Sequence, residues 1–125
     1  MPTYSFAHRG PVMGTGEFIM GFFEITSSSG TPTITSDPDN LTSAIADTAT
    51  GSATVTLTHR YYKINAFCNH EAAGGLGVAN ASTVTDGLSA ANTLLVNVSD
   101  VNTGALADID GVTTVMVLGR LVAGS

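Results

Sequence analysis

Hydrophobic and polar residues alternate along much of the chain, a pattern that predicts β-strands separated by tight turns. The alternation is clearest over residues 52–58, where Ala53, Val55 and Leu57 share one face and three threonines the other. Such a strand covers a core on one side and meets solvent on the other. The pattern predicts further strands over residues 33–36, 61–68, 93–98 and 112–122. In the strand over residues 61–68, the side chains expected on one face are Tyr62, Ile64, Ala66 and Cys68.

Residues 17–26, EFIMGFFEIT, form the most hydrophobic segment. Both faces of a strand here would be apolar, which predicts burial on one side by the core and on the other by a neighbouring subunit. The two sets of alternating residues are Phe18, Met20 and Phe22 on one side, and Ile19, Phe23 and Ile25 on the other. A buried helix is the alternative, but the aromatic and β-branched content favours a strand.

Three other segments are defined by turn residues or by a weak pattern. Residues 41–50 fit a helix capped by Asn40 or a strand, and the strand is favoured. Residues 72–86 are rich in Gly and Ala without periodicity, so a long loop or arm is expected there, with Gly74–Gly77 free to adopt positive φ. Residues 37–40 and 108–111 are turn signals, and the second, with its Asp-Gly pair, suits a type I′ hairpin.

These segments together predict an all-β protein with six to eight strands. The expected architecture is a small antiparallel sandwich or a barrel-like fold of jelly-roll or β-tulip type, with one β domain over residues 17–125. Residues 1–16 contain Pro2, Gly10, Pro11, Gly14 and Gly16, a composition expected of an extended N-terminal arm that becomes ordered against a partner. This segment also lacks the basic and apolar regions of a signal peptide. No apolar stretch reaches the 18 residues expected of a transmembrane helix.

The composition bears on the partners. Charged residues make up only 11% of the 125 residues, against about 25% in an ordinary domain, whereas hydrophobic residues make up 43%. We therefore expect a sizeable part of the surface to face other protein; a monomer covered by hydroxyl groups remains the alternative. The net charge of −6, with only four Lys and Arg residues, argues against direct binding of nucleic acid and against attraction to a membrane surface.

The sequence offers little chemistry. Cys68 and His70 would share a strand face, with Glu71 beside them and Asp86 or Asp108 as a third member, but a single cysteine in an apolar stripe is usually core filler. Two groups of residues could offer oxygen ligands to Ca²⁺ without the spacing of a calcium loop, so they are interpreted as turn formers: Asp37, Asp39 and Asn40, and Asp108 with Asp110. We expect no catalytic residues, no metal site and no cofactor, and hence a protein that is not an enzyme.

Three segments carry a resemblance to a known class: the hairpin over residues 47–57, the Tyr61-Tyr62 strand, and residues 108–121 (DIDG…VMVLGRL). Together they resemble small β-rich virion structural proteins of tailed bacteriophages, of the capsid decoration, or cement, type. The resemblance covers about two-thirds of the chain, in the style of its motifs. It implies a homo-trimer on the capsid surface of the virion, made in the host cytoplasm, whose N-terminal arm docks on the major capsid protein.

Two sets of contact residues follow from this reading. The capsid-contact arm is expected to use Pro2, Tyr4, Phe6 and Arg9. The subunit interface is expected to use Phe18, Met20, Phe22, Met116 and Leu118. The alternative function is a tail or fibre β module that binds a host surface glycan or receptor, for which Tyr61 and Tyr62 are the candidate aromatic residues.

Overall fold

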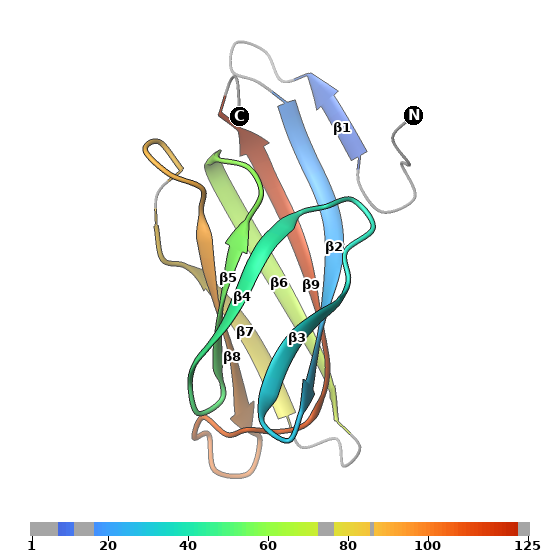
Figure 1. Ribbon diagram of the computed structural model, residues 1–125, viewed down its shortest axis with the longest axis vertical. Coiled ribbons are helices and arrows are strands. Elements are labelled where there is room, and N and C mark those ends of the chain that lie inside the picture. The colour runs from blue at the N-terminus through green and yellow to red at the C-terminus, as the bar shows by residue number, and fades with distance from the viewer. Residues whose placement is uncertain (1–7, 12–16, 73–76, 86, 123–125) are drawn as a thin grey trace.

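Nine β-strands make up the regular structure of a computed structural model that describes residues 8–11, 17–72, 77–85 and 87–122 (Figure 1). The strands are β1 (His8–Pro11), β2 (Glu17–Ser28), β3 (Thr31–Ser36), β4 (Thr42–Ala49), β5 (Ser52–Leu57), β6 (Tyr61–Ala72), β7 (Gly77–Thr83), β8 (Thr93–Asp100) and β9 (Gly111–Leu121). The described residues contain no helix, and thus no helix long and apolar enough to cross a membrane.

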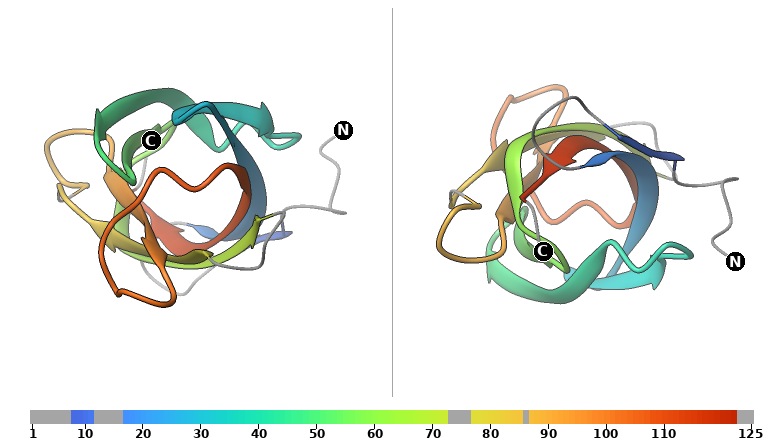
Figure 2. Two further views of the ribbon diagram at one scale, coloured as in Figure 1. Left: turned by 90° about the horizontal axis from the view of Figure 1, so that it is seen from below. Right: turned by 90° about the horizontal axis from the view of Figure 1, so that it is seen from above.

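The strands form two antiparallel sheets. Sheet A has the order β1-β2-β9-β6, and β3 pairs with the C-terminal half of β2. Sheet B has the order β4-β5-β8-β7. Seen end-on in Figure 2, the two sheets curve around a common interior, with β3 and β4 on one side and β6 and β9 on the other. The predicted all-β antiparallel sandwich is therefore confirmed.

The core lies between the sheets because the inward positions of both sheets are apolar. Strands β2, β5, β6, β8 and β9 all contribute to one buried cluster. Its most completely buried side chains are Tyr61, Phe23, Leu57, Leu94, Val55, Val115 and Val117. A methyl group added at Gly119 would lie 2.8 Å from Cδ1 of Tyr61, so the glycine makes room for the tyrosine ring against β9.

Asp side chains fix the turns by accepting hydrogen bonds from backbone N–H groups. The Asp37 carboxylate accepts the N–H groups of Leu41 and Thr42, each at 2.8 Å. This arrangement confirms the turn predicted over residues 37–40 and leads the chain from sheet A into sheet B. The ambiguous segment that follows is strand β4, as favoured from the sequence.

The Asp-Gly pair of residues 108–111 does not form the predicted type I′ hairpin. The strands on either side of it, β8 and β9, belong to different sheets, so the segment crosses between sheets. Its two carboxylates instead bind distant turns. Asp108 accepts the N–H of Gly51 at 2.6 Å, and Asp110 accepts those of Ser29 and Gly30 at 3.0 and 3.1 Å.

Two further predictions are wrong. The expected loop over residues 72–86 contains strand β7, which pairs with β8 along its whole length although its small side chains give little hydrophobic contrast. Tyr62 does not share the inward face of β6. A register shift between Tyr61 and Lys63 turns Tyr61 into the core and leaves Tyr62 exposed, and Ile64 then continues the inward face.

The predicted N-terminal arm is described only in part. Residues 8–11 form β1, an edge strand in which Arg9 pairs with Ile19 of β2. Strand β1 therefore extends sheet A. Pro2, Tyr4 and Phe6 lie outside the described residues.

Candidate functional site

The outer face of sheet A carries a row of large apolar side chains. Strand pairing places Phe22 of β2 directly opposite Met116 of β9, and Met116 directly opposite Phe67 of β6. Phe22 is 40% exposed and Phe67 is 55% exposed. Three adjacent strands thus hold one apolar row across the sheet, and its aromatic ends are open to solvent.

A second row adjoins the first, two residues further along each strand. Met20 of β2 lies opposite Leu118 of β9, and Met20 is 38% exposed. Phe18 continues this line along β2. We call the resulting patch the apolar face of sheet A; its members are Phe18, Met20, Phe22, Phe67, Met116 and Leu118.

The face exists because β2 and β9 are apolar on both sides. Along β2, Ile19, Phe23 and Ile25 point into the core, so the alternate residues Met20, Phe22 and Glu24 point outward. The same alternation along β9 buries Val115 and Val117 and leaves Met116 on the outside. The core therefore accounts for only half of the hydrophobic residues in these strands.

Charged side chains lie at the two ends of this face and have opposite signs. At one end, Lys63 of β6 pairs with Arg120 of β9. Toward the other end, Glu24 lies opposite Thr114 and Glu71 lies opposite Val112. The apolar face is thus bounded by a basic end and an acidic end.

An open hollow lies where the apolar face meets the basic end. Its volume is about 410 Å³. The lining residues are Phe18, Lys63, Asn65, Leu118, Gly119 and Arg120. Its apolar floor and basic rim fit an apolar side chain of a partner with a carboxylate beside it.

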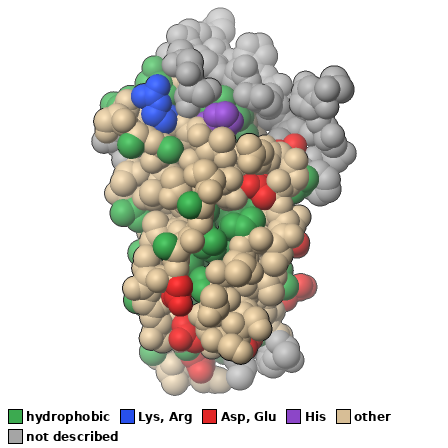
Figure 3. Space-filling model, viewed as in Figure 1, with side chains coloured by type: hydrophobic (Ala, Val, Ile, Leu, Met, Phe, Trp, Pro, Cys, Tyr) green, Lys and Arg blue, Asp and Glu red, His purple; other side chains and the backbone are tan. Residues whose placement is uncertain are grey.

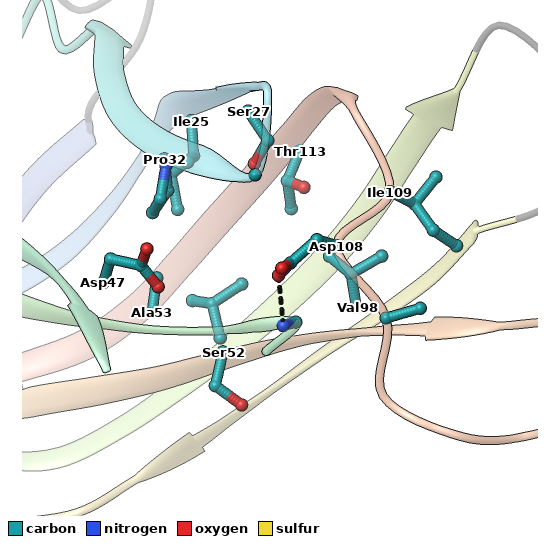
Figure 4. A pocket seen from close by; sticks show the side chains of 14 residues that line it. Ile25, Ser27, Pro32, Asp47, Ser52, Ala53, Val98, Asp108, Ile109 and Thr113 are labelled. Atoms are coloured by element: carbon teal, nitrogen blue, oxygen red, sulfur yellow. Dashed lines mark hydrogen bonds between the residues drawn. The ribbon is translucent and has the colours of Figure 1, made fainter. Parts of the chain in front are cut away.

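A second space lies inside the sandwich, near the turn between β4 and β5 (Figure 4). It holds only about 30 Å³ and is lined by apolar residues such as Ile25 and Val98 together with Asp108. The Asp108 carboxylate points to the backbone N–H of Gly51, as the dashed line in Figure 4 marks. This volume is far below that of a typical ligand pocket, which is about 300–1,000 Å³.

Cys68 and His70 share the inward face of β6, but their environment suppresses nucleophilic chemistry. Burial raises the pKa of the Cys68 thiol to about 11, so the thiol is protonated at neutral pH. Burial lowers the pKa of His70, whose Nδ1 lies 2.8 Å from Oγ1 of Thr113. Both side chains pack between the two sheets. Among the described residues, no group of three or more His, Cys, Asp or Glu is placed to hold a metal ion.

The face of the molecule that carries β3 and β4 has a different character (Figure 3). Tan atoms of backbone and uncharged polar side chains cover most of it, and the green hydrophobic side chains are scattered or lie in depressions. On β3, Thr33 and Thr35 are exposed, and Thr35 bonds with Thr26 through their hydroxyl groups at 2.8 Å. Hydroxyl groups hydrate part of the surface, as the monomer alternative supposed, but the outer face of sheet A carries a contiguous apolar patch.

All five residues expected at a subunit interface lie together on the apolar face of sheet A. Phe67 is the functional candidate that the sequence interpretation missed. It stands between Ala66 and Cys68, which were assigned to the inward face, so the same alternation indicates that Phe67 points outward. Its position beside Met116 follows only from the pairing of β6 with β9.

Comparison of the chain with protein-family models, with curated proteins and with solved structures found no match.

Proposed function

We propose that this chain is a virion structural protein of a tailed bacteriophage that decorates and cements the capsid by binding across joints between major capsid protein subunits. The observation that carries the proposal is the exposed apolar face of sheet A, centred on Phe22, Met116 and Phe67. Exposed, contiguous apolar surface of this kind is typical of protein-binding sites. The resemblance of the hairpin, the Tyr61-Tyr62 strand and the closing strand to cement proteins supplies the identity of the partner.

The proposed mechanism is additive. Each copy buries apolar surface against capsid protein, and this surface must be exposed again before the shell can open at that joint. Many copies on one shell add their contributions, so a modest gain per copy becomes a large resistance to rupture. The sandwich suits this role because its turns are fixed by Asp37, Asp108 and Asp110, and a rigid module loses little conformational freedom when it binds.

A tail or fibre module that binds a glycan is the less favoured function. Sugar rings are usually held by exposed aromatic side chains. Tyr61 is 1% exposed and fills the core, whereas Tyr62 is 45% exposed. Of the two adjacent tyrosines, only Tyr62 can stack on a sugar.

Co-sedimentation with purified capsid shells of the phage that encodes the chain tests the proposal. We expect the wild-type chain to pellet with mature, expanded shells, and Phe67→Ser to remain in the supernatant. Val78→Ser is the matched control, because Val78 is a 50% exposed apolar residue on β7 of sheet B. Failure of the wild-type chain to bind shells contradicts the capsid role.

A further inference from the structure

We propose that the apolar face of sheet A binds the same face of a second copy of this chain, with the strands of the two copies antiparallel about a two-fold axis. The inference goes beyond capsid binding and does not depend on it, because self-association can be measured in the absence of shells. A dimer formed through this face must dissociate before the face binds capsid protein. It also replaces the trimer implied by the resemblance with a dimer. Three observations carry it: the extent of the face, its position between opposite charges, and the order of these charges along the strands.

The size of the face limits how tightly two copies can bind. The outward residues from the pair Lys63–Arg120 to the pair Glu71–Val112 span nine residues of β6, whose eight steps cover about 27 Å of strand. Three strands add a width of about 14 Å with their side chains, so each copy offers about 400 Å². A pair of such faces buries about 800 Å², less than the roughly 1,200–2,000 Å² of a standard interface, so we expect a weak dimer that dissociates in the upper micromolar range or above.

The order of the charges along the strands favours a second copy as the partner, with its strands antiparallel to those of the first. On β6, the outward side chains run from basic Lys63 through Phe67 to acidic Glu71. The two-fold axis lies between the two facing sheets and crosses the strands at right angles at Phe67. Rotation by 180° about it places Lys63 of each copy over Glu71 of the other, so the dimer contains two such pairs. The row of Phe22, Met116 and Phe67 then meets itself at the centre. The central row and the two charged ends of β6 are therefore complementary to those of a second copy, whereas Met20 and Leu118 come to lie over Glu24 and Thr114.

Neighbouring positions agree with this arrangement. Asn65 falls over Asn69 of the second copy, and two amides in contact can exchange hydrogen bonds. Arg120, one strand away from Lys63, also comes to lie over the acidic end, within reach of Glu24 and Glu71. Sheets packed face to face keep their strands within about 30° of each other, so the basic end of one copy stays over the acidic end of the other.

The same charges oppose a trimer in which the three faces meet with parallel strands. In that arrangement, Lys63 and Arg120 of every copy gather at one end, and Glu24 and Glu71 of every copy gather at the other. Like charges brought together at an interface cost affinity and suppress that mode of assembly. The antiparallel dimer removes both repulsions.

Sedimentation equilibrium of the full chain from about 1 µM to about 1 mM tests the proposal, since this range brackets a micromolar dissociation constant. We expect a monomer–dimer equilibrium. Phe67→Ser should weaken dimerisation by about 100-fold or more, because Phe67 meets its own copy on the two-fold axis and each dimer loses it twice. Val78→Ser, in sheet B, should leave the dissociation constant unchanged, and circular dichroism should show both variants folded.

Charge reversal tests the antiparallel geometry. Lys63→Glu alone and Glu71→Lys alone should each weaken the dimer by about tenfold, because each reversal replaces two attractive pairs by two repulsive ones. The double variant K63E/E71K should restore most of the lost affinity, because the exchanged pair attracts again, although Arg120 then loses its acidic neighbour at position 71 of the second copy. Lys63 and Glu71 lie about 27 Å apart within one copy, so restoration can only arise between copies.

Every outcome decides the inference. A wild-type monomer over the whole range overturns self-association, and a trimer, or a dimer that the double variant fails to restore, overturns the antiparallel pairing. Capsid binding by a monomer would leave the proposed function standing without this inference, and a dimer that does not bind shells would leave the inference without the proposed function.

Discussion

Two adjacent residues of β9, Val117 and Met116, are expected to respond differently to truncation. Val117 is 0% exposed and lies in the core, whereas Met116 points out of sheet A. Val117→Ala removes two methyl groups from the core, a loss of about 1.6 kcal/mol of transfer free energy. A residual cavity of up to about 50 Å³ adds about 1 kcal/mol, so the free energy of unfolding should fall by 2–3 kcal/mol in rough terms. Met116→Ala should lower it by about 1 kcal/mol or less, because the Met116 side chain is only partly buried on the outside of sheet A.

Urea denaturation followed by circular dichroism measures both effects. The protein should be kept at a low concentration, at which self-association makes no contribution to stability. The urea midpoint of Val117→Ala should fall without a change in the m-value, and its Tm should drop by about 10 °C. Equal losses in the two variants, or a larger loss in Met116→Ala, would refute the assignment of inward and outward faces on β9.

Three other outcomes are expected from the interior. Gly119→Ala should lower the free energy of unfolding by about 1–3 kcal/mol in a urea titration, because its methyl group would lie 2.8 Å from the Tyr61 ring; a neutral result would mean that the ring is free to move. Burial lowers the pKa of His70 in the folded chain, so as the pH falls below about 6.5 the unfolded state binds more protons than the folded state does. The free energy of unfolding should therefore decrease as the pH is lowered. Urea midpoints between pH 7.5 and pH 5 should show this fall and should show less of it in His70→Gln; an equal slope in the variant would contradict the assignment. Burial raises the pKa of Cys68 from 9.0 to about 11, so at pH 8 its thiolate population should be about 100-fold lower in the native state than in urea. The rate of maleimide labelling should fall by the same factor. Equal labelling rates in the two states would show that the thiol is not buried.

Strands with strong hydrophobic contrast could be predicted from the sequence, whereas strands defined by pairing could not. β2, β5, β8 and β9 all contain alternating large apolar residues, and all four were predicted. β7 was not predicted, because residues such as Ala79 and Ala81 have side chains too small to mark an inward face. This segment becomes a strand through its pairing with β8.

The turn at residues 108–111 was misread for a related reason. Asp-Gly is compatible with a hairpin, but a hairpin also requires that the flanking strands belong to one sheet. Here the carboxylates of Asp108 and Asp110 bind the turns at Gly51 and Gly30, which lie 57 and 80 residues away in the chain. Partners at such separations are set by the fold as a whole, and local sequence carries no signal for them.

The candidate site was predictable in its composition and not in its geometry. The sequence interpretation named five of the six residues of the apolar face, all of them on β2 and β9, as a subunit interface. Phe67 and the two charged ends depend on the register of β6 against β9, which places Lys63 beside Arg120 and Phe67 beside Met116. Cross-strand register is a tertiary property, so the charge order along the face appears only in the folded chain.

Hydroxyl-radical footprinting of native phage particles, read by mass spectrometry against the free chain at low concentration, tests the central claim most directly. If the apolar face of sheet A binds protein in the virion, then Phe67, Met20 and Met116 will be oxidised much more slowly in the particle than in the free chain. Val78, on the other sheet, serves as the internal reference. Equal oxidation of Phe67 in the two samples, or absence of the chain from purified particles, would contradict the account.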